Sequence, residues 1–156
     1  MKIFLRLTLD CSVESAWAAL ADPAIFAAVS APLMRFKSLE PGGFPEKWTA
    51  QGPHLVAIKL FGVIPMGKQT IDTTFTQRPG GVKMMIDSGS PQAGMLTVIK
   101  DWDHRMAVSA SSNSTTLYRD RLKIKAGVLT PFVFLPLWVF WQYRGIKLRR
   151  LAKKWN

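Results

Sequence analysis

The chain is short of the residue types on which several classes of site depend. Its 156 residues include one cysteine, Cys11, and two histidines, His54 and His104. A single cysteine excludes an internal disulfide framework and a cysteine-based zinc site, so nothing requires an oxidising compartment. The N-terminus has no long apolar run with a cleavage site. We therefore interpret it as a strand rather than a signal peptide, and we expect a cytoplasmic protein.

Common catalytic and phosphate-binding loops are also missing. The stretch GSPQAG at 89–94 is not a Gly-x-Ser-x-Gly elbow, and RPGGVK at 78–83 lacks the Gly-Lys-Ser/Thr of a phosphate loop. The cluster DWDHR at 101–105 has no second His or Cys group near it. We therefore expect no metal site and no cofactor.

Acidic residues are absent from the end of the chain, and this absence produces the net charge of +11. Residues 1–120 hold 12 Lys and Arg against 10 acids, whereas residues 121–156 hold 9 Lys and Arg and no acid. Such a tail is typical of a nucleic-acid groove or of the solvated face of one helix. We favour the helix, because its aromatic residues do not alternate with the basic ones as base-stacking platforms would.

The remaining pattern predicts one α+β domain over residues 1–156. Lys2–Leu9 alternates with period two, as a strand does. Ser12 and Asp22-Pro23 are starting signals for two short helices. Gly- and Pro-rich turns then separate a series of predicted strands: Leu33–Leu39, Glu46–Ala50, His54–Phe61, Lys68–Gln77, Val82–Ser88, Gly94–Trp102, Met106–Ser111 and Thr115–Lys125.

The chain closes with an amphipathic helix. The uncharged run from Val128 to Tyr143 has 16 residues and two prolines, short of the roughly 20 that span a bilayer. We expect the helix to start near Pro136 or to kink there. An apolar stripe continues through the basic half, with Arg144 on the opposite, basic side. The stripe consists of Phe134, Trp138, Trp141, Gly145, Leu148, Ala152 and Trp155.

Several segments together resemble the START-like, helix-grip superfamily, also called SRPBCC or polyketide cyclase/dehydrase-like, and most of all its uncharacterised bacterial branch. They are VESAWAALADPAIFAAVS, FPEKW, LFGVIPMGKQTID, WDHR and TTLYRDRLKIKAGVLTPFVFLPLWVFWQYRGIKLRRL. The resemblance implies a curved antiparallel sheet of about seven to eight strands around a long C-terminal helix, with an apolar cavity between them. Members bind lipids, sterols, polyketides or hormones, and some are cyclases. The resemblance supplies no catalytic motif for this chain.

Strand alternation predicts which side chains line such a cavity. A mostly apolar lining with a few polar groups is the usual composition of a small-molecule pocket. The predicted ligand-binding residues are Val56, Ile58, Leu60, Gln69, Ile71, Thr73, Phe75, Met84, Ile86, Met106, Val108, Tyr118 and Asp120, together with Trp138 and Trp141 of the helix.

Asp120 is the leading candidate for chemistry. It alternates with apolar residues on the inward face of the last strand, where burial would raise the pKa of its carboxyl group and allow it to act as a base. His104 is a weaker candidate that could transfer protons with Asp120. The alternative is a structural ion pair of Asp120 with Arg6, Arg35 or His104.

Three functions are compatible with these features. The first and favoured one is non-catalytic binding of an apolar, lipid-like or aromatic small molecule. The second is a cyclase or dehydratase that uses Asp120, with or without His104. The third is association of the basic helix with an anionic membrane surface. Extra aromatics on the helix, Phe132, Phe140 and Tyr143, leave open a homodimer contact, a membrane contact, or simply the flank of a thick helix.

Overall fold

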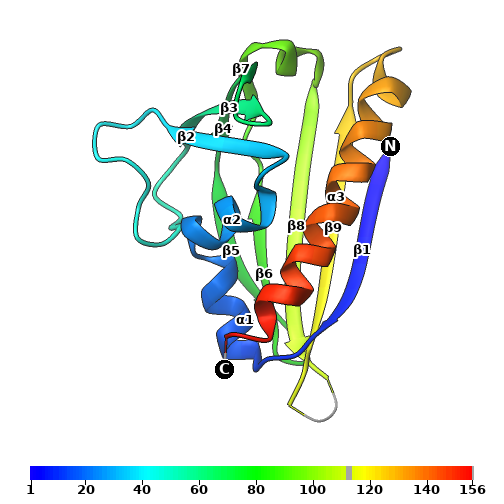
Figure 1. The fold of residues 1–156 in the computed structure, drawn as a ribbon. Helices are drawn as coiled ribbons and strands as arrows, with labels where there is room; N and C mark the ends of the chain where they lie inside the picture. The colour runs from blue at the N-terminus through cyan, green and yellow to red at the C-terminus, as the bar shows by residue number, and fades with distance from the viewer. Residues whose placement is uncertain (112–113, 156) are drawn as a thin grey trace.

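The structure, a computed structural model, describes residues 1–111 and 114–155. Two antiparallel sheets form a curved surface, and one long helix lies along its inner side (Figure 1). The predicted α+β class with a helix covering a curved antiparallel sheet is confirmed. The described residues form nine strands, slightly more than the seven or eight expected.

The larger sheet has five strands and carries most of the inner surface. Its central strands β8 and β9 pair over ten residues each, and β1 pairs with β9 along its whole length. In spatial order the strands are β1 (Lys2–Leu9), β9 (Thr116–Lys125), β8 (Asp101–Ala110), β6 (Val82–Asp87) and β5 (Thr73–Arg78).

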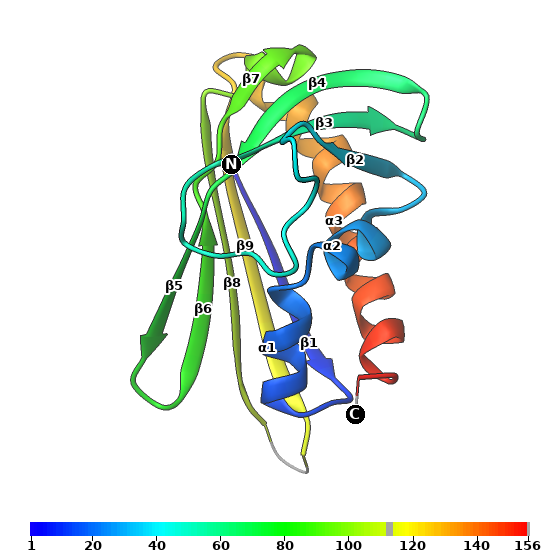
Figure 2. The same cartoon turned by 90° about the vertical axis from the view of Figure 1, so that its left-hand side faces the viewer.

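The smaller sheet has four strands and crosses one end of the larger one (Figure 2). In spatial order they are β2 (Met34–Ser38), β3 (His54–Leu60), β4 (Ile64–Ile71) and β7 (Pro91–Gly94). Only Asp72 separates β4 from β5, so the chain turns there from one sheet into the other. A Cβ on Gly89 would lie 1.9 Å from the carbonyl oxygen of Thr70, so only glycine fits at this junction.

Two short helices, α1 (Val13–Leu20) and α2 (Pro23–Ser30), follow β1 and begin as predicted. The hydroxyl of Ser12 accepts a hydrogen bond from the Ser15 backbone N–H at 3.1 Å, and the Asp22 carboxylate accepts one from Ala24 N–H at 2.7 Å. Each bond satisfies one of the free N–H groups that a helix start leaves.

The closing helix α3 (Thr130–Ala152) begins before Pro136 and contains it, so of the two alternatives the start near Pro136 is wrong. Gly145 lies against β1, where an added Cβ would be 3.3 Å from Leu5 Cδ1, and this close approach anchors α3 on the sheet. Among the described residues no helix is both long enough and apolar enough to cross a lipid bilayer.

Three strand predictions are wrong. Residues 46–50 form no strand, and residues 95–98 form a 3-10 helix, η1 (Met95–Val98). The predicted strand Lys68–Gln77 is instead split at Asp72 between the two sheets. Alternation alone does not detect such a change of sheet, because the period of two continues on either side of it.

Candidate functional site

A buried polar cluster surrounds Asp120 at the centre of β9. Asp120 Oδ1 lies 2.9 Å from His104 Nε2 and accepts a hydrogen bond from Trp141 Nε1 at 3.0 Å. Asp120 Oδ2 accepts one from the Tyr118 hydroxyl at 2.7 Å. Because an ionised carboxylate only accepts, Nε2 of His104 is the donor in that pair. Strands β8 and β9 and helix α3 therefore converge on one carboxylate.

The environment of Asp120 favours its charged form. Burial alone would raise the pKa of this carboxyl group. The neighbouring His104, the Arg144 charge and the Trp141 hydrogen bond outweigh burial and lower the pKa to about 2. The expected raised pKa is therefore wrong. The alternative of a structural pair with His104 is confirmed, and Asp120 is a poor proton acceptor at neutral pH.

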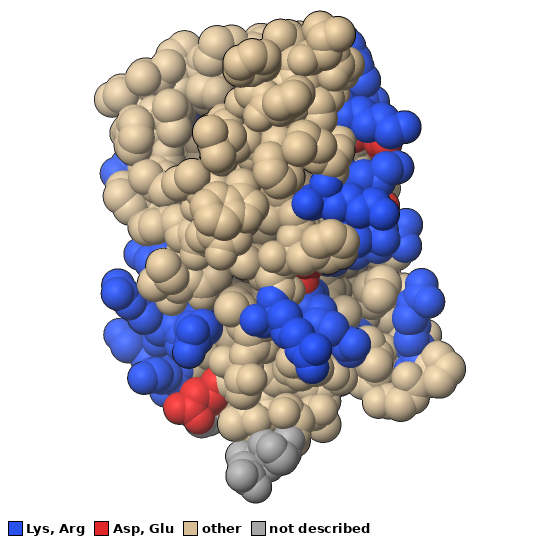
Figure 3. Space-filling model, turned by 90° about the vertical axis from the view of Figure 1, so that its right-hand side faces the viewer, with Lys and Arg blue, Asp and Glu red and all other residues tan. Residues whose placement is uncertain are grey.

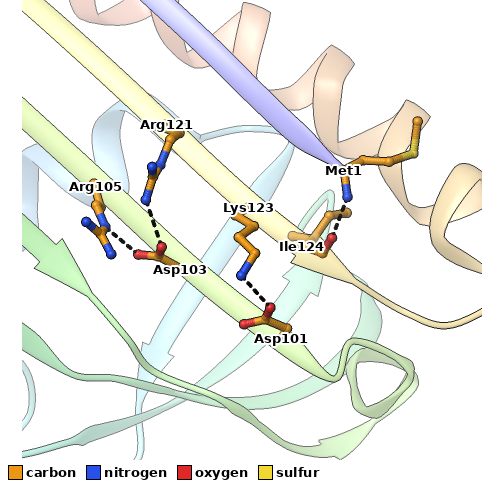
Figure 4. Close-up of polar contacts among 7 residues, drawn as sticks. All are labelled: Met1, Asp101, Asp103, Arg105, Arg121, Lys123 and Ile124. Carbon is orange, nitrogen blue, oxygen red and sulfur yellow. Dashed lines mark hydrogen bonds and ion pairs between the residues drawn. The ribbon is translucent and has the colours of Figure 1, made fainter.

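Several charged residues on the opposite face of β8 and β9 form ion pairs at the surface (Figure 4). Asp103 lies 2.8 Å from both Arg105 and Arg121, and Asp101 lies 2.9 Å from Lys123. The two faces thus differ as the alternation of β9 predicts. The outer face carries solvated ion pairs, and the inner face carries the buried cluster.

A second buried carboxylate, Asp87 at the end of β6, was not predicted. Its Oδ1 accepts hydrogen bonds from the backbone N–H groups of Asp72 at 2.9 Å and Gly89 at 3.0 Å. Burial raises the pKa of Asp87, and the nearby His104 and these hydrogen bonds only partly offset the effect. Asp87 therefore joins the two sheets and is the carboxyl group with the greater tendency to hold a proton.

Arg144 of α3 was expected on the basic side of the helix, but the structure places it over the cavity. Its guanidinium carbon lies 4.9 Å from the ring centre of Trp141 and 5.8 Å from that of Phe140. Among the described residues, no carboxylate forms an ion pair with it, and its buried Nε has no hydrogen-bond partner. Arg144 follows Trp141 by three residues, which places both on the same face of a helix. This spacing is the sequence signal that could have predicted the position of Arg144 over the cavity.

Two small adjoining cavities lie between the sheets and α3. The first, about 50 Å³, reaches from Leu20 and Trp48 to Asp120. The second, about 70 Å³, reaches from Val56 and Gln69 to Trp141. Both are lined by Phe26, Ile71, Asp87, His104 and Arg144. A buried water needs roughly 10–15 Å³, so the two cavities offer room for several waters or a small organic group.

Many of the predicted lining residues face these cavities. Thr73, Met106, Tyr118 and Asp120 line the first cavity, Val56, Ile58, Gln69 and Trp141 line the second, and Ile71 lines both. Leu60 lies instead in a surface groove, Phe75 packs edge-on against Trp17, and Val108 is fully buried in the core.

Three of the predicted lining residues point the other way. On β6, Met85 and Asp87 are buried facing the cavity, so Met84 and Ile86 belong to the outer face, and the predicted phase of this strand is wrong by one residue. Trp138 is 45% exposed, because the inward stripe of α3 passes through Leu137 and Phe140 instead.

A larger groove on the surface adjoins the second cavity. It has a volume of about 660 Å³ and lies between the β3–β4 hairpin, η1 and the first half of α3. All fifteen residues that line it are apolar. Five of them also line the second cavity: Met34, Leu96, Ile99, Leu137 and Phe140. These side chains are therefore a shared wall between the groove and the interior.

In the described part of the chain, no group of three or more His, Cys, Asp or Glu is placed to hold a metal ion.

Comparison with known proteins identifies the fold. No protein-family model and no curated protein matches the chain. Among solved structures, a Chromobacterium violaceum structural-genomics protein matches with a TM-score of 0.65 at 17% identity, over 97% of this chain and 96% of its own. Norcoclaurine synthase from Thalictrum flavum matches with a TM-score of 0.65 at 9% identity, over 99% and 94%. The chain has the helix-grip fold.

A third match within the helix-grip fold is the Zhui aromatase/cyclase from Streptomyces, with a TM-score of 0.58 at 10% identity over 99% of this chain and 94% of its own. The resemblance deduced from the sequence is thus confirmed for the fold. Norcoclaurine synthase has also been solved in complex with dopamine and hydroxybenzaldehyde. At identities this low, the likeness assigns the architecture and leaves the chemistry to the residues of each chain.

Proposed function

We propose that this protein binds an amphipathic small molecule between its sheets and α3, with a polar oxygen of the ligand at Arg144 and an apolar body against the cavity walls. The observation that carries the proposal is the Arg144 guanidinium. It lines both cavities and has no ion-pair partner among the described residues. A buried donor without an acceptor is costly, and a ligand oxygen would satisfy it.

The size of the cavities limits what the ligand can be. Together they provide about 120 Å³, the sum of 50 and 70, whereas pockets for drug-sized ligands have roughly 300–1,000 Å³. A single aromatic ring or a short chain suits the interior. A longer, lipid-like body would extend past the shared wall at Leu137 and Phe140 into the apolar groove. The complex of norcoclaurine synthase, a structural neighbour, with dopamine and hydroxybenzaldehyde supports a ligand of this class.

Catalysis through Asp120 is less well supported. The carboxylate has three hydrogen-bond partners and a pKa of about 2, so it lacks the proton affinity that a base needs at neutral pH. We therefore assign Asp120 to holding His104, Tyr118 and Trp141 in place around the cavity.

Thermal unfolding in the presence of phenylacetate and decanoate, with native mass spectrometry of the purified protein, tests the proposal. We expect a concentration-dependent rise in Tm, because a ligand that binds only the folded state stabilises it. Ile71→Trp, which places a larger side chain at a residue that lines both cavities, should abolish the rise. Ile146→Trp, at an exposed position of α3, is the matched control and should keep it. No retained apolar molecule and no change in Tm with either compound would contradict the proposal.

A further inference from the structure

One end of the molecule exposes an unusual number of large apolar side chains. Val128 is 90% exposed, Phe132 77% and Val63 72%, and Phe61, Met95 and Leu135 are each more than half exposed. Phe61 and Val63 lie in the β3–β4 hairpin, Met95 in η1, Val128 just before α3, and Phe132 and Leu135 in its first half. Of these, Phe61, Met95 and Phe132 line the apolar groove. We call this surface the groove end. Apolar patches of this kind on soluble domains mark contacts with another apolar phase.

The four-stranded sheet beside the groove carries only positive charges. Its strands contain Arg35, Lys37, Lys59 and Lys68, and no Asp or Glu. Arg35 and Lys59 are directly opposite each other across β2 and β3. Like charges at such a position destabilise a sheet, and no carboxylate within the described residues forms an ion pair with any of the four. This arrangement is complementary to a negatively charged surface.

Figure 3 shows the molecule from the side of β1 and α3. The upper part of this face is largely uncharged, and Lys and Arg side chains gather along its lower border and one edge. A second copy of this chain would match an apolar area but would bring its own charge of +11 against the cations of the four-stranded sheet. An anionic lipid surface offers an apolar layer for the exposed apolar side chains and negatively charged headgroups for the cations.

We propose that the groove end docks on an anionic lipid bilayer. Phe132 and the hairpin tip around Val63 enter the interfacial region, and the cations of the four-stranded sheet contact the headgroups. The groove then opens toward the acyl chains. The docking surface is the first half of α3 and the hairpin, rather than the basic second half of α3. This inference does not depend on the internal cavities binding a ligand.

Vesicle flotation measures the docking directly. The full chain is mixed with vesicles of phosphatidylcholine, or of phosphatidylcholine and phosphatidylglycerol in equal parts, at low and at physiological ionic strength. We expect binding to the anionic vesicles, weakened by salt but not abolished, and little binding to phosphatidylcholine alone. Apolar insertion explains the part that resists salt, and headgroup attraction explains the rest.

Matched variants locate the contact. The pair Val63→Ser and Phe132→Ser should weaken binding about tenfold or more. The control Phe4→Ser removes an aromatic side chain of β1 that is 63% exposed and lies outside the groove, and it should leave binding unchanged. The pair Lys59→Gln and Lys68→Gln should weaken binding about fivefold for each charge removed. The pair Arg149→Gln and Arg150→Gln, at exposed positions near the end of α3, should have a smaller effect.

Three results would overturn the inference. The first is no binding to anionic vesicles. The second is binding that the Val63 and Phe132 pair leaves intact while the Arg149 and Arg150 pair removes it, because the basic half of α3 would then be the contact. The third is a concentration-dependent dimer in light scattering that Phe132→Ser dissociates, because the groove end would then be covered by a second copy.

Discussion

The interior and the groove end of this protein reverse the usual distribution of side chains. The interior holds Asp87, Asp120, His104 and part of Arg144, whereas the groove end holds apolar side chains that are mostly in water. Each buried polar group costs free energy unless it is paired, and each exposed apolar group stabilises nothing in the isolated chain. Both regions are therefore the places where a function is expected. They differ in one respect. Most polar groups of the interior form hydrogen bonds within the chain, whereas the apolar side chains of the groove end remain largely exposed to water.

The strongest test of that difference removes the carboxylate at the centre of the cluster. Asp120→Ala leaves His104, Tyr118 and Trp141 without their acceptor and should lower the free energy of unfolding by about 3–5 kcal/mol. Urea denaturation measures the loss. Asp103→Ala is the control, because its ion pairs lie on the outer face of the same two strands and should contribute about 1 kcal/mol or less. Equal losses for the two variants would contradict a distinct role for the interior.

Acid should separate the two buried carboxyl groups, because their pKa shifts have opposite signs. The pKa of Asp120 is lowered to about 2, so its stabilisation is complete above the unfolded value of about 4 and is lost as pH falls toward 2. The pKa of Asp87 is raised, so its contribution grows as pH falls through its folded-state pKa toward the unfolded value.

Denaturation between pH 6 and roughly pH 2 checks these signs. Asp120→Asn should flatten the loss of stability in acid, by about 2–3 kcal/mol for a shift of this size. Asp87→Asn should make the loss steeper, because it removes the opposing contribution. Parallel curves for the two variants would mean that neither carboxyl group has the shift assigned to it.

The regular parts of this fold could be predicted from the sequence, and the reasons are local. From Tyr118 to Lys125, β9 alternates buried and basic residues. Period and burial therefore agree, and the predicted inward orientation of Tyr118 and Asp120 was correct. The caps at Ser12 and Asp22 were correct because each depends on one side chain and a backbone N–H two or three residues away.

The predictions failed where the local contrast is weak. β6 has Met84 and Met85 in succession, one on each face, so the sequence VKMMID does not fix which face is buried. Arg144 was assigned to solvent because it is charged, but an arginine can stack on an aromatic ring and still direct its donors into a cavity. At the change of sheet, the Asp72 backbone N–H donates a hydrogen bond to Asp87, which is 15 residues away. The alternation of apolar and polar residues is a local pattern and does not reveal this contact.

The interior can also be tested at Arg144, whose buried Nε has no hydrogen-bond partner among the described residues. Arg144→Gln should weaken binding of phenylacetate or decanoate about tenfold or more, because the charged donor for the ligand oxygen is lost. The free energy of unfolding should change by about 1 kcal/mol or less, the usual size of a cation–π contact such as that with Trp141. Arg150→Gln, an exposed position on the same helix, should change neither quantity. Unchanged affinity in Arg144→Gln would remove Arg144 from the site.

The groove end allows the opposite kind of prediction, a substitution that stabilises the fold and weakens the contact. Lys59→Glu places a carboxylate opposite Arg35 and should raise the free energy of unfolding by about 0.2–1 kcal/mol. The same change should reduce binding to anionic vesicles, because a cation becomes an anion.

Lys123→Glu is the matched control. It breaks the partly exposed pair with Asp101 and should lower stability slightly while leaving the four-stranded sheet unchanged. If Lys59→Glu neither stabilises the chain nor weakens vesicle binding, the row of cations is an ordinary solvated surface. If it does both, the positive charge at this position costs stability and is retained for the docking surface.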